Sequence, residues 1–184
     1  RDWSWSSGLG DVYKRQNQVS LDNFDAISYH PYTEGRRHPA RGHFRDVVKG
    51  FYSKVESFGP VPPLWATEFG WFGLAHDAKK FVPYKNPFVA REILDEKESA
   101  EAYIQSICTA FANGVEKAFY FTLLEGNVLD RWLHGWVGPG GRSVELGFIA
   151  AATACDLIAD MQCLGQEFIE GGICQTKFLS LIHI

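Results

Sequence analysis

Apolar residues recur along the chain with two different periods, and the alternation of these periods predicts the order of the secondary-structure elements. Short apolar runs at 24–29, 63–69 and 116–123 predict three buried strands. Between and after them, apolar residues recur every three or four positions over 44–58, 100–111 and 148–164, which predicts three helices. Gly59 with Pro60, and later Gly114, mark the predicted ends of the first two helices. The predicted order is βαβαβα.

This alternation predicts an α/β fold with parallel strands and right-handed crossovers, either in an open sheet or in an arc of a barrel. No Gly-rich phosphate loop follows any of the predicted strands, so the pattern disfavours nucleotide binding. Residues 165–178 are interpreted as the start of a further strand or of an appended domain.

Both ends of the chain read as translated sequencing adapters rather than as natural protein. Residues 11–16, D-V-Y-K-R-Q, are the translation of the DNA end sequence that is recognised by the transposase used in preparing sequencing libraries. Residues 179–184, L-S-L-I-H-I, translate the reverse complement of that sequence. We therefore expect residues 1–16 and 179–184 to be non-native, with a natural segment at 17–178 whose gene was cut at both ends.

Size and charge narrow the classes of function. The expected natural segment is shorter than the roughly 250 residues of a complete (β/α)8 barrel. The chain carries 22 acidic and 18 basic residues, a net charge of −4, which disfavours a nucleic-acid partner. No apolar run approaches the roughly 20 residues of a membrane helix, so no membrane partner is expected.

The four cysteines are not arranged like a metal or redox motif, since they have neither C-x-x-C spacing nor histidine neighbours. Cys108 and Cys155 fall in helical patterns and are interpreted as buried thiols. Cys163 and Cys174 are expected to pair only if the parent protein is secreted, and the localisation stays open.

Polar residues follow the predicted strands at the end where parallel α/β folds carry their active sites. The first strand leads to His30 and Tyr32, and the second carries Glu68 followed by Trp71. Glu68 stands out because an ionised carboxylate near the end of an apolar strand is costly unless hydrogen bonds or charge stabilise it.

The motifs H-P-Y at 30–32 and W-A-T-E-F-G-W at 65–71 resemble clan A of the glycoside hydrolases, which includes cellulase-like and xylosidase-like barrels. The resemblance covers about residues 24–164 and implies strands six to eight of a TIM barrel, with 17–164 as the C-terminal part of its catalytic domain. Glu68 matches the nucleophile in its T-E-F-G context, and His30 and Tyr32 match the His-x-Tyr of the sixth strand.

The resemblance implies a retaining hydrolase of β-linked glycosides, with a carbohydrate substrate and neither metal nor other cofactor. Tyr32 is expected to donate a hydrogen bond that orients Glu68, while His30 bonds a sugar hydroxyl or a neighbouring carboxylate. The family's acid/base residue, in an Asn-Glu pair after the fourth strand, would precede Asn17. We therefore expect the chain alone to be inactive. The third strand also departs from the family, because it reads Phe119, Tyr120, Phe121 where many members carry a Trp under the sugar.

Other interpretations of the same residues stay open. Glu68 and His30 are possible ligands of a metal-dependent barrel enzyme, and the chain is also a possible non-catalytic sugar-binding remnant. Trp71, Trp132 and Trp136 are predicted to stack on sugar rings, and packing within the loops is an equal alternative. Glu125 and Asp130, beyond the third strand, are interpreted as solvated loop charges.

Overall fold

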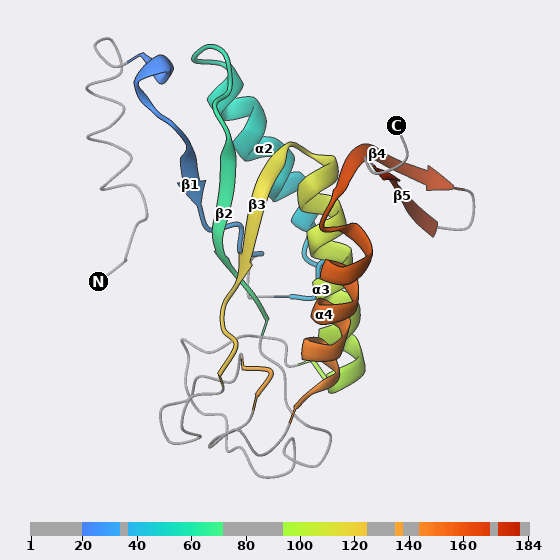
Figure 1. Ribbon diagram of the computed structural model, residues 1–184. Coiled ribbons are helices and arrows are strands. Elements are labelled where there is room, and N and C mark those ends of the chain that lie inside the picture. The colour runs from blue at the N-terminus through green and yellow to red at the C-terminus, as the bar shows by residue number, and fades with distance from the viewer. Residues whose placement is uncertain are drawn as a thin grey trace, which may run out of the picture.

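The computed structural model describes residues 20–33, 37–71, 94–124, 135–137, 144–169 and 173–180 (Figure 1). Its strands and helices alternate as predicted up to the last helix. In order, the elements are η1 (Leu21–Asn23), β1 (Ile27–Tyr29), α2 (Phe44–Glu56), β2 (Leu64–Phe69), α3 (Glu96–Ala112), β3 (Val115–Tyr120), α4 (Leu146–Ile158), β4 (Met161–Ile169) and β5 (Ile173–Ser180).

The first three strands form one parallel sheet in the order β1-β2-β3, which confirms the predicted mixed α/β fold with parallel strands. Leu64 in the central strand pairs with Ile27 on one side and with Val115 on the other. The helices α2, α3 and α4 lie on one side of this sheet (Figure 1). Because the strands are parallel, their C-terminal ends meet at one edge, and the loops that carry the predicted site residues leave from that edge.

The sheet face away from the helices keeps several side chains accessible. Lys117 on β3 pairs with Trp65 on β2, and its ammonium nitrogen lies 4.3 Å from the centre of the Trp65 ring. Phe119 is two residues further along β3, so alternation places it on the same face, and it is 49% exposed. This face is therefore partly aromatic.

Helix α2 buries one apolar stripe against the sheet and leaves its polar side in solvent. Phe44 and Val48 are fully buried, and the Phe51 ring stacks on Tyr29 of β1 with ring centres 4.1 Å apart. Gly59 follows the helix with a φ of +138°, a conformation that side chains with a Cβ rarely adopt. The predicted end of this helix is confirmed.

Helix α3 begins one turn before the first residue of its predicted apolar pattern, because a capping box starts it at Glu96. The Glu98 backbone N–H donates to the Asp95 carboxylate at 2.8 Å, and the Asp95 N–H donates to the Glu98 carboxylate at 3.1 Å. Gly114 follows the helix with a φ of +89°, where an added Cβ would lie 2.6 Å from the Tyr52 ring. Its predicted role at the end of this helix is confirmed.

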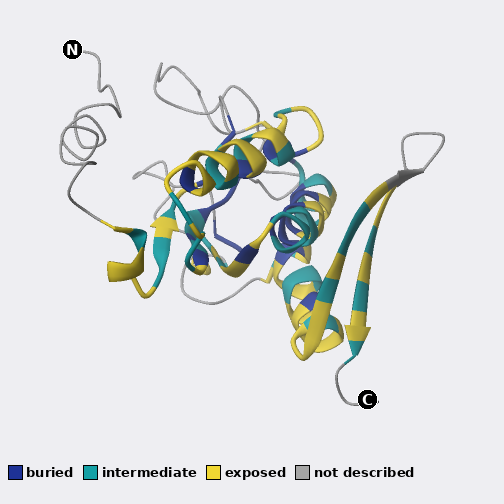
Figure 2. Cartoon of the chain, turned by 90° about the horizontal axis from the view of Figure 1, so that it is seen from above, coloured by how far each residue is buried: buried dark blue, intermediate teal, exposed yellow. Residues whose placement is uncertain are grey.

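The core lies between the sheet and the helices and is largely aromatic (Figure 2). Phe69 of β2 is at its centre, with ring centres 6.3 Å from Phe44, 5.9 Å from Tyr120 and 6.5 Å from Tyr103. Phe44, Phe69 and Tyr103 are each at most 6% exposed. Burying aromatic rings of this size supplies much of the hydrophobic stabilisation of a small core.

The last predicted helix is too long by about one and a half turns. The prediction extended it to Leu164, but α4 ends at Ile158 and residues 161–169 form β4. Strand β4 pairs antiparallel with β5, so pairing with a later segment overrides the local helical pattern. None of the described helices is long and apolar enough to cross a lipid bilayer.

The hairpin of β4 and β5 is separate from the parallel sheet and projects from the helices (Figure 2). Its strands cover residues 165–169 and 173–178 of the range that was predicted to begin a further strand or domain. Strand β5 continues two residues past the expected boundary, since Leu179 pairs with Gln162 and Ser180 with Met161. An alternating apolar stretch can pair with a free strand edge whatever its origin.

The conditional pairing of Cys163 with Cys174 does not fit the register of the hairpin. Cys163 pairs in register with Phe178, which is four residues from Cys174 along β5. At about 3.4 Å per residue the two Cα atoms are well beyond the roughly 7 Å that a disulfide can bridge. Of the two thiols predicted to be buried, Cys108 is half-buried and Cys155 is exposed.

Replacing Phe44 with Ala should lower the free energy of unfolding by about 3–5 kcal/mol, because the change leaves a cavity beside Phe69 and Trp71. Urea unfolding followed by circular dichroism measures the loss. Phe58→Ala is the matched control, since that ring is 45% exposed and its removal should cost less than about 1 kcal/mol. Equal losses in the two variants would contradict the assigned core.

Candidate active site at the strand ends

The carboxylate of Glu68 stays out of the core because the register of β2 breaks beside it. Leu64 and Ala66 are buried on the helix side, and strict alternation would turn Glu68 to that side as well. The pairing with β3 is irregular between Ala66 and Phe69, so Phe69 takes the buried position instead. The Glu68 side chain is 29% exposed at the C-terminal end of the strand.

Two side chains from the loop that follows β1 reach this carboxylate. The Tyr32 hydroxyl donates a hydrogen bond to Glu68 Oε1, which confirms the contact that the sequence predicts. His30 Nδ1 lies 3.7 Å from Glu68 Oε2, so the imidazole faces the other oxygen. The three predicted residues His30, Tyr32 and Glu68 therefore lie together, although their catalytic roles stay predictions.

The backbone after β1 explains how both ring side chains face one carboxylate. The Tyr32 N–H donates to the His30 carbonyl at 2.9 Å, which folds the chain into a tight turn around the buried Pro31. The His30 and Tyr32 rings meet edge to face, with centres 6.4 Å apart. Tyr32 is half-buried and the His30 side chain is 39% exposed, so the site is open to solvent on the His30 side.

This geometry suits a carboxylate that reacts or binds through one oxygen. The phenol holds Oε1 in a hydrogen bond to a charged acceptor, an interaction worth about 1.5–3 kcal/mol. The imidazole, at 39% exposure, adds an ion pair only when it is protonated, and such a solvent-exposed pair contributes little. The phenol is thus the group that orients Glu68.

Two of the three predicted sugar-stacking tryptophans are core residues, so that prediction is wrong for them. Trp71 is 2% exposed, packs edge-on against Phe44 at 5.8 Å, and donates its indole N–H to the Arg37 carbonyl at 2.7 Å. Trp136 is 5% exposed and stacks on Tyr120 with ring centres 3.7 Å apart. Both rings pack against other protein side chains, as the alternative to sugar stacking predicts.

The remaining predicted residues of this region lie outside the described residues. These are Trp132, Glu125 and Asp130.

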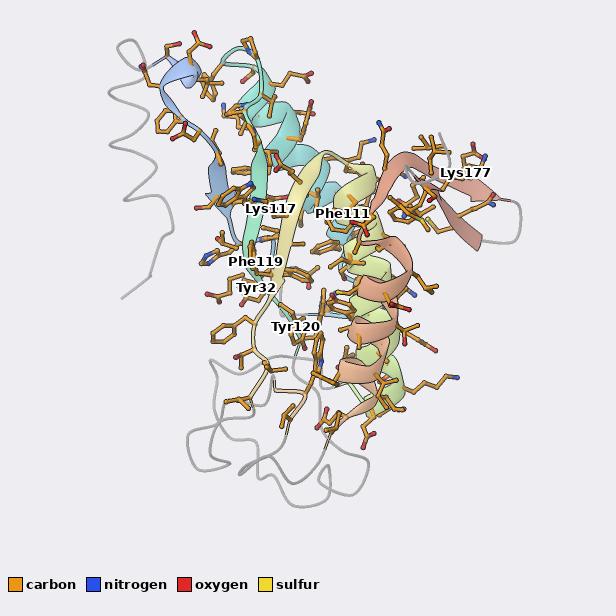
Figure 3. All side chains as sticks on the ribbon, viewed as in Figure 1. Tyr32, Phe111, Lys117, Phe119, Tyr120 and Lys177 are labelled. Carbon is orange, nitrogen blue, oxygen red and sulfur yellow. The ribbon has the colours of Figure 1, made fainter. Side chains whose placement is uncertain are left out.

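An accessible aromatic ring, Phe119, lies beside the site and was not among the predicted site residues. Ala66 pairs with Ala118 and Phe69 with Tyr120, so Phe119 lies opposite the irregular stretch of β2 that contains Thr67 and Glu68. Figure 3 places Phe119 and Tyr32 at the same end of the sheet, whereas Tyr120 packs against Tyr103 of α3. The alternation of side chains along 115–120 could have identified this ring, because it assigns Phe119 and Tyr120 to opposite faces of the strand.

A second carboxylate with an unusual environment, Glu145, lies where α4 begins. Burial raises the pKa of Glu145 from 4.5 to about 7, and the negative charge of Glu96 at the start of α3 adds to this shift. Burial also raises the pKa of Tyr120 well above its usual range, with a smaller contribution from the charge of Glu145. Sequence reasoning did not single out Glu145, because neither contact is local in the chain.

No model of a known protein family matches the chain, and a search of curated proteins finds no similar sequence.

Protonated Glu145 favours the folded state, so stability should depend on pH. Its pKa is higher when folded, so the stabilisation is fully present below pH 4.5 and is lost as the pH rises through about 7. Glu145→Gln should remove this loss, which is about 1–2 kcal/mol after allowing for solvent screening of a partly buried group. Thermal unfolding at pH 5 and pH 8 measures it.

The control is Glu116→Gln, which changes an exposed carboxylate at the start of β3. That variant should keep the pH dependence of the unmodified protein. If Glu145→Gln also keeps it, Glu145 is ionised in the folded protein at neutral pH.

Proposed function

We propose that this chain is part of a retaining β-glycoside hydrolase in which Glu68 is the nucleophile. The observation that carries the proposal is the hydrogen bond from Tyr32 to Glu68 at the C-terminal ends of adjacent parallel strands. It joins the two motifs, H-P-Y and W-A-T-E-F-G-W, that carry the resemblance to clan A. A carboxylate that attacks carbon must be ionised and oriented, and a phenol that donates to one oxygen favours both.

The architecture supports the same proposal at a coarser level. Three parallel strands in sequential order, with helices on one side, are compatible with an arc of a (β/α)8 barrel. In such an arc the uncovered sheet face, with Trp65 and Phe119, would be the barrel interior. The strand ends would then be the catalytic face, where Glu68, His30 and Tyr32 lie.

The proposed reaction proceeds in two displacements. An oxygen of Glu68 attacks the anomeric carbon, and the glycosidic oxygen leaves with the bonding electron pair and takes a proton from a carboxylic acid about 5–5.5 Å away. Water then attacks the glycosyl ester, gives its proton to the same carboxylate, and releases Glu68. His30 would hold a sugar hydroxyl or the second oxygen of Glu68.

We assign the acid/base carboxyl to a part of the protein outside the described residues. The family resemblance predicts it in an Asn-Glu pair upstream of Asn17. With that upstream sequence restored, Glu68→Ala should abolish turnover.

Two alternatives use the same residues without this chemistry. A metal-dependent enzyme would use Glu68 and His30 as ligands, but within the described ranges no group of three or more His, Cys, Asp or Glu is arranged to hold an ion. A sugar-binding remnant would keep the accessible aromatic face without any covalent step. Trapping the covalent step therefore separates the proposal from both alternatives.

A 2-deoxy-2-fluoro-β-glycoside with a dinitrophenolate leaving group tests Glu68 directly, because this leaving group departs without protonation and needs no acid residue. A panel with gluco, manno and xylo configurations covers the main sugars. Intact mass spectrometry should give one added glycosyl group, and peptide mapping should place it on Glu68. Glu68→Gln should take up no label, while Glu116→Gln should label like the unmodified chain. Label on another residue, or undiminished labelling of Glu68→Gln, would refute the nucleophile.

Tyr32→Phe should slow this labelling about ten- to hundredfold, because it removes a hydrogen bond of about 1.5–3 kcal/mol to a charged group. The rate is read from a time course of intact masses. Tyr52→Phe removes a hydroxyl from a half-buried tyrosine on α2 and serves as the matched control, with an expected rate close to that of the unmodified chain. An unchanged rate in Tyr32→Phe would mean that the phenol does not orient the nucleophile.

A further inference from the structure

A groove of about 650 Å³ lies between the start of α2, the middle of α3 and the β4–β5 hairpin. Two thiols line it from different elements, Cys108 from α3 and Cys174 from β5. Cys108 is half-buried and Cys174 is exposed, and both are free thiols. The three residues of the proposed hydrolase site, His30, Tyr32 and Glu68, do not line this groove.

One side chain links the two segments that carry the cysteines. The Gln166 amide nitrogen of β4 donates to Thr109 Oγ1 on α3 and to Thr176 Oγ1 on β5, each at 3.2 Å. Thr109 directly follows Cys108, and Thr176 lies two residues from Cys174, on the same face of β5. Each cysteine is therefore within two residues of a group bonded to the same amide.

The charges around the thiols differ in a way that gives them different roles. Burial raises the pKa of Cys108, and the neighbouring thiols of Cys163 and Cys174 raise it further. Burial also raises the pKa of Cys174, but the positive charge of Arg45 opposes that shift. Since Cys174 is exposed and has a cationic neighbour, it is the thiol that an external disulfide reaches first.

We propose that Cys108 and Cys174 form a disulfide under oxidising conditions and thereby tie the hairpin to α3. The other cysteines are less suited. Cys163 is near enough to Cys108 to raise its pKa, but it lines the neighbouring cavity with Met161 and Phe178 and not this groove. Cys155 is exposed on α4.

Glutathione disulfide is the oxidant for this step. The Cys174 thiolate attacks one of its sulfurs, which forms a mixed disulfide and expels one glutathione thiolate. The Cys108 thiolate then attacks the Cys174 sulfur and expels the second glutathione. Two protein thiols are oxidised, one glutathione disulfide is reduced to two thiols, and the two thiol protons pass to the glutathione products.

The test is titration of the full chain with mixtures of reduced and oxidised glutathione at pH 8, at protein concentrations low enough to keep it monomeric. The reaction is quenched with N-ethylmaleimide, and the unreduced protein is digested and mapped by mass spectrometry. We expect two of the four thiols to be lost and one cross-linked peptide pair joining Cys108 to Cys174. The bridge should raise the thermal midpoint by roughly 5–10 °C over the reduced protein.

Cys155→Ser is the matched control and should form the same bridge, whereas Cys174→Ser, at an exposed position, should fold normally and form none. The disulfide is mapped in the unmodified chain, so the test does not depend on whether a Cys108→Ser variant folds. Four free thiols at the most oxidising ratio, a bridge that involves Cys163 or Cys155, or a stable mixed disulfide at Cys174 would each overturn the proposal.

Discussion

The break in the register of β2 between Ala66 and Phe69 decides where the Glu68 carboxylate lies, and the rest of the candidate site depends on it. A regular strand would turn Glu68 toward the helices, into an aromatic core that cannot solvate an ionised carboxylate. The irregularity gives that buried position to Phe69, and Glu68 reaches the Tyr32 hydroxyl instead. The irregular register of β2 thus places Phe69 in the core and Glu68 in the candidate site.

The aromatic core behind this strand gives the site a rigid support. Phe69, adjacent to Glu68 in the chain, is held by Phe44 of α2 and by Tyr103 of α3. The buried rings of Trp71 and Trp136 extend this support and are not part of an accessible surface. A carboxylate on well-packed backbone needs few direct contacts to keep its orientation, which is consistent with a site built on one phenol and one imidazole.

The sequence predicted the elements whose signals are local and failed where the deciding contact is distant. Strand and helix periods located the parallel sheet, and the motifs brought Tyr32 and Glu68 together. The burial of Trp71 was not predictable. A tryptophan that follows a strand has the same sequence context whether its indole faces a substrate or donates to a carbonyl such as that of Arg37. The end of α4 and the separation of Cys163 from Cys174 depend on the register of a hairpin, which no local pattern specifies.

Helix α3 connects the two halves of the molecule, because its opposite sides face different partners. Tyr103 packs against Phe69 and Tyr120 behind the strand ends. Cys108 and Thr109 face the hairpin, which is held there through Gln166. A covalent tie on the hairpin side would restrain the helix without touching the rings that support Glu68. Because packed aromatic rings resist small displacements of their backbone, such a tie would change the stability of the helix layer more than the geometry of the carboxylate and its phenol.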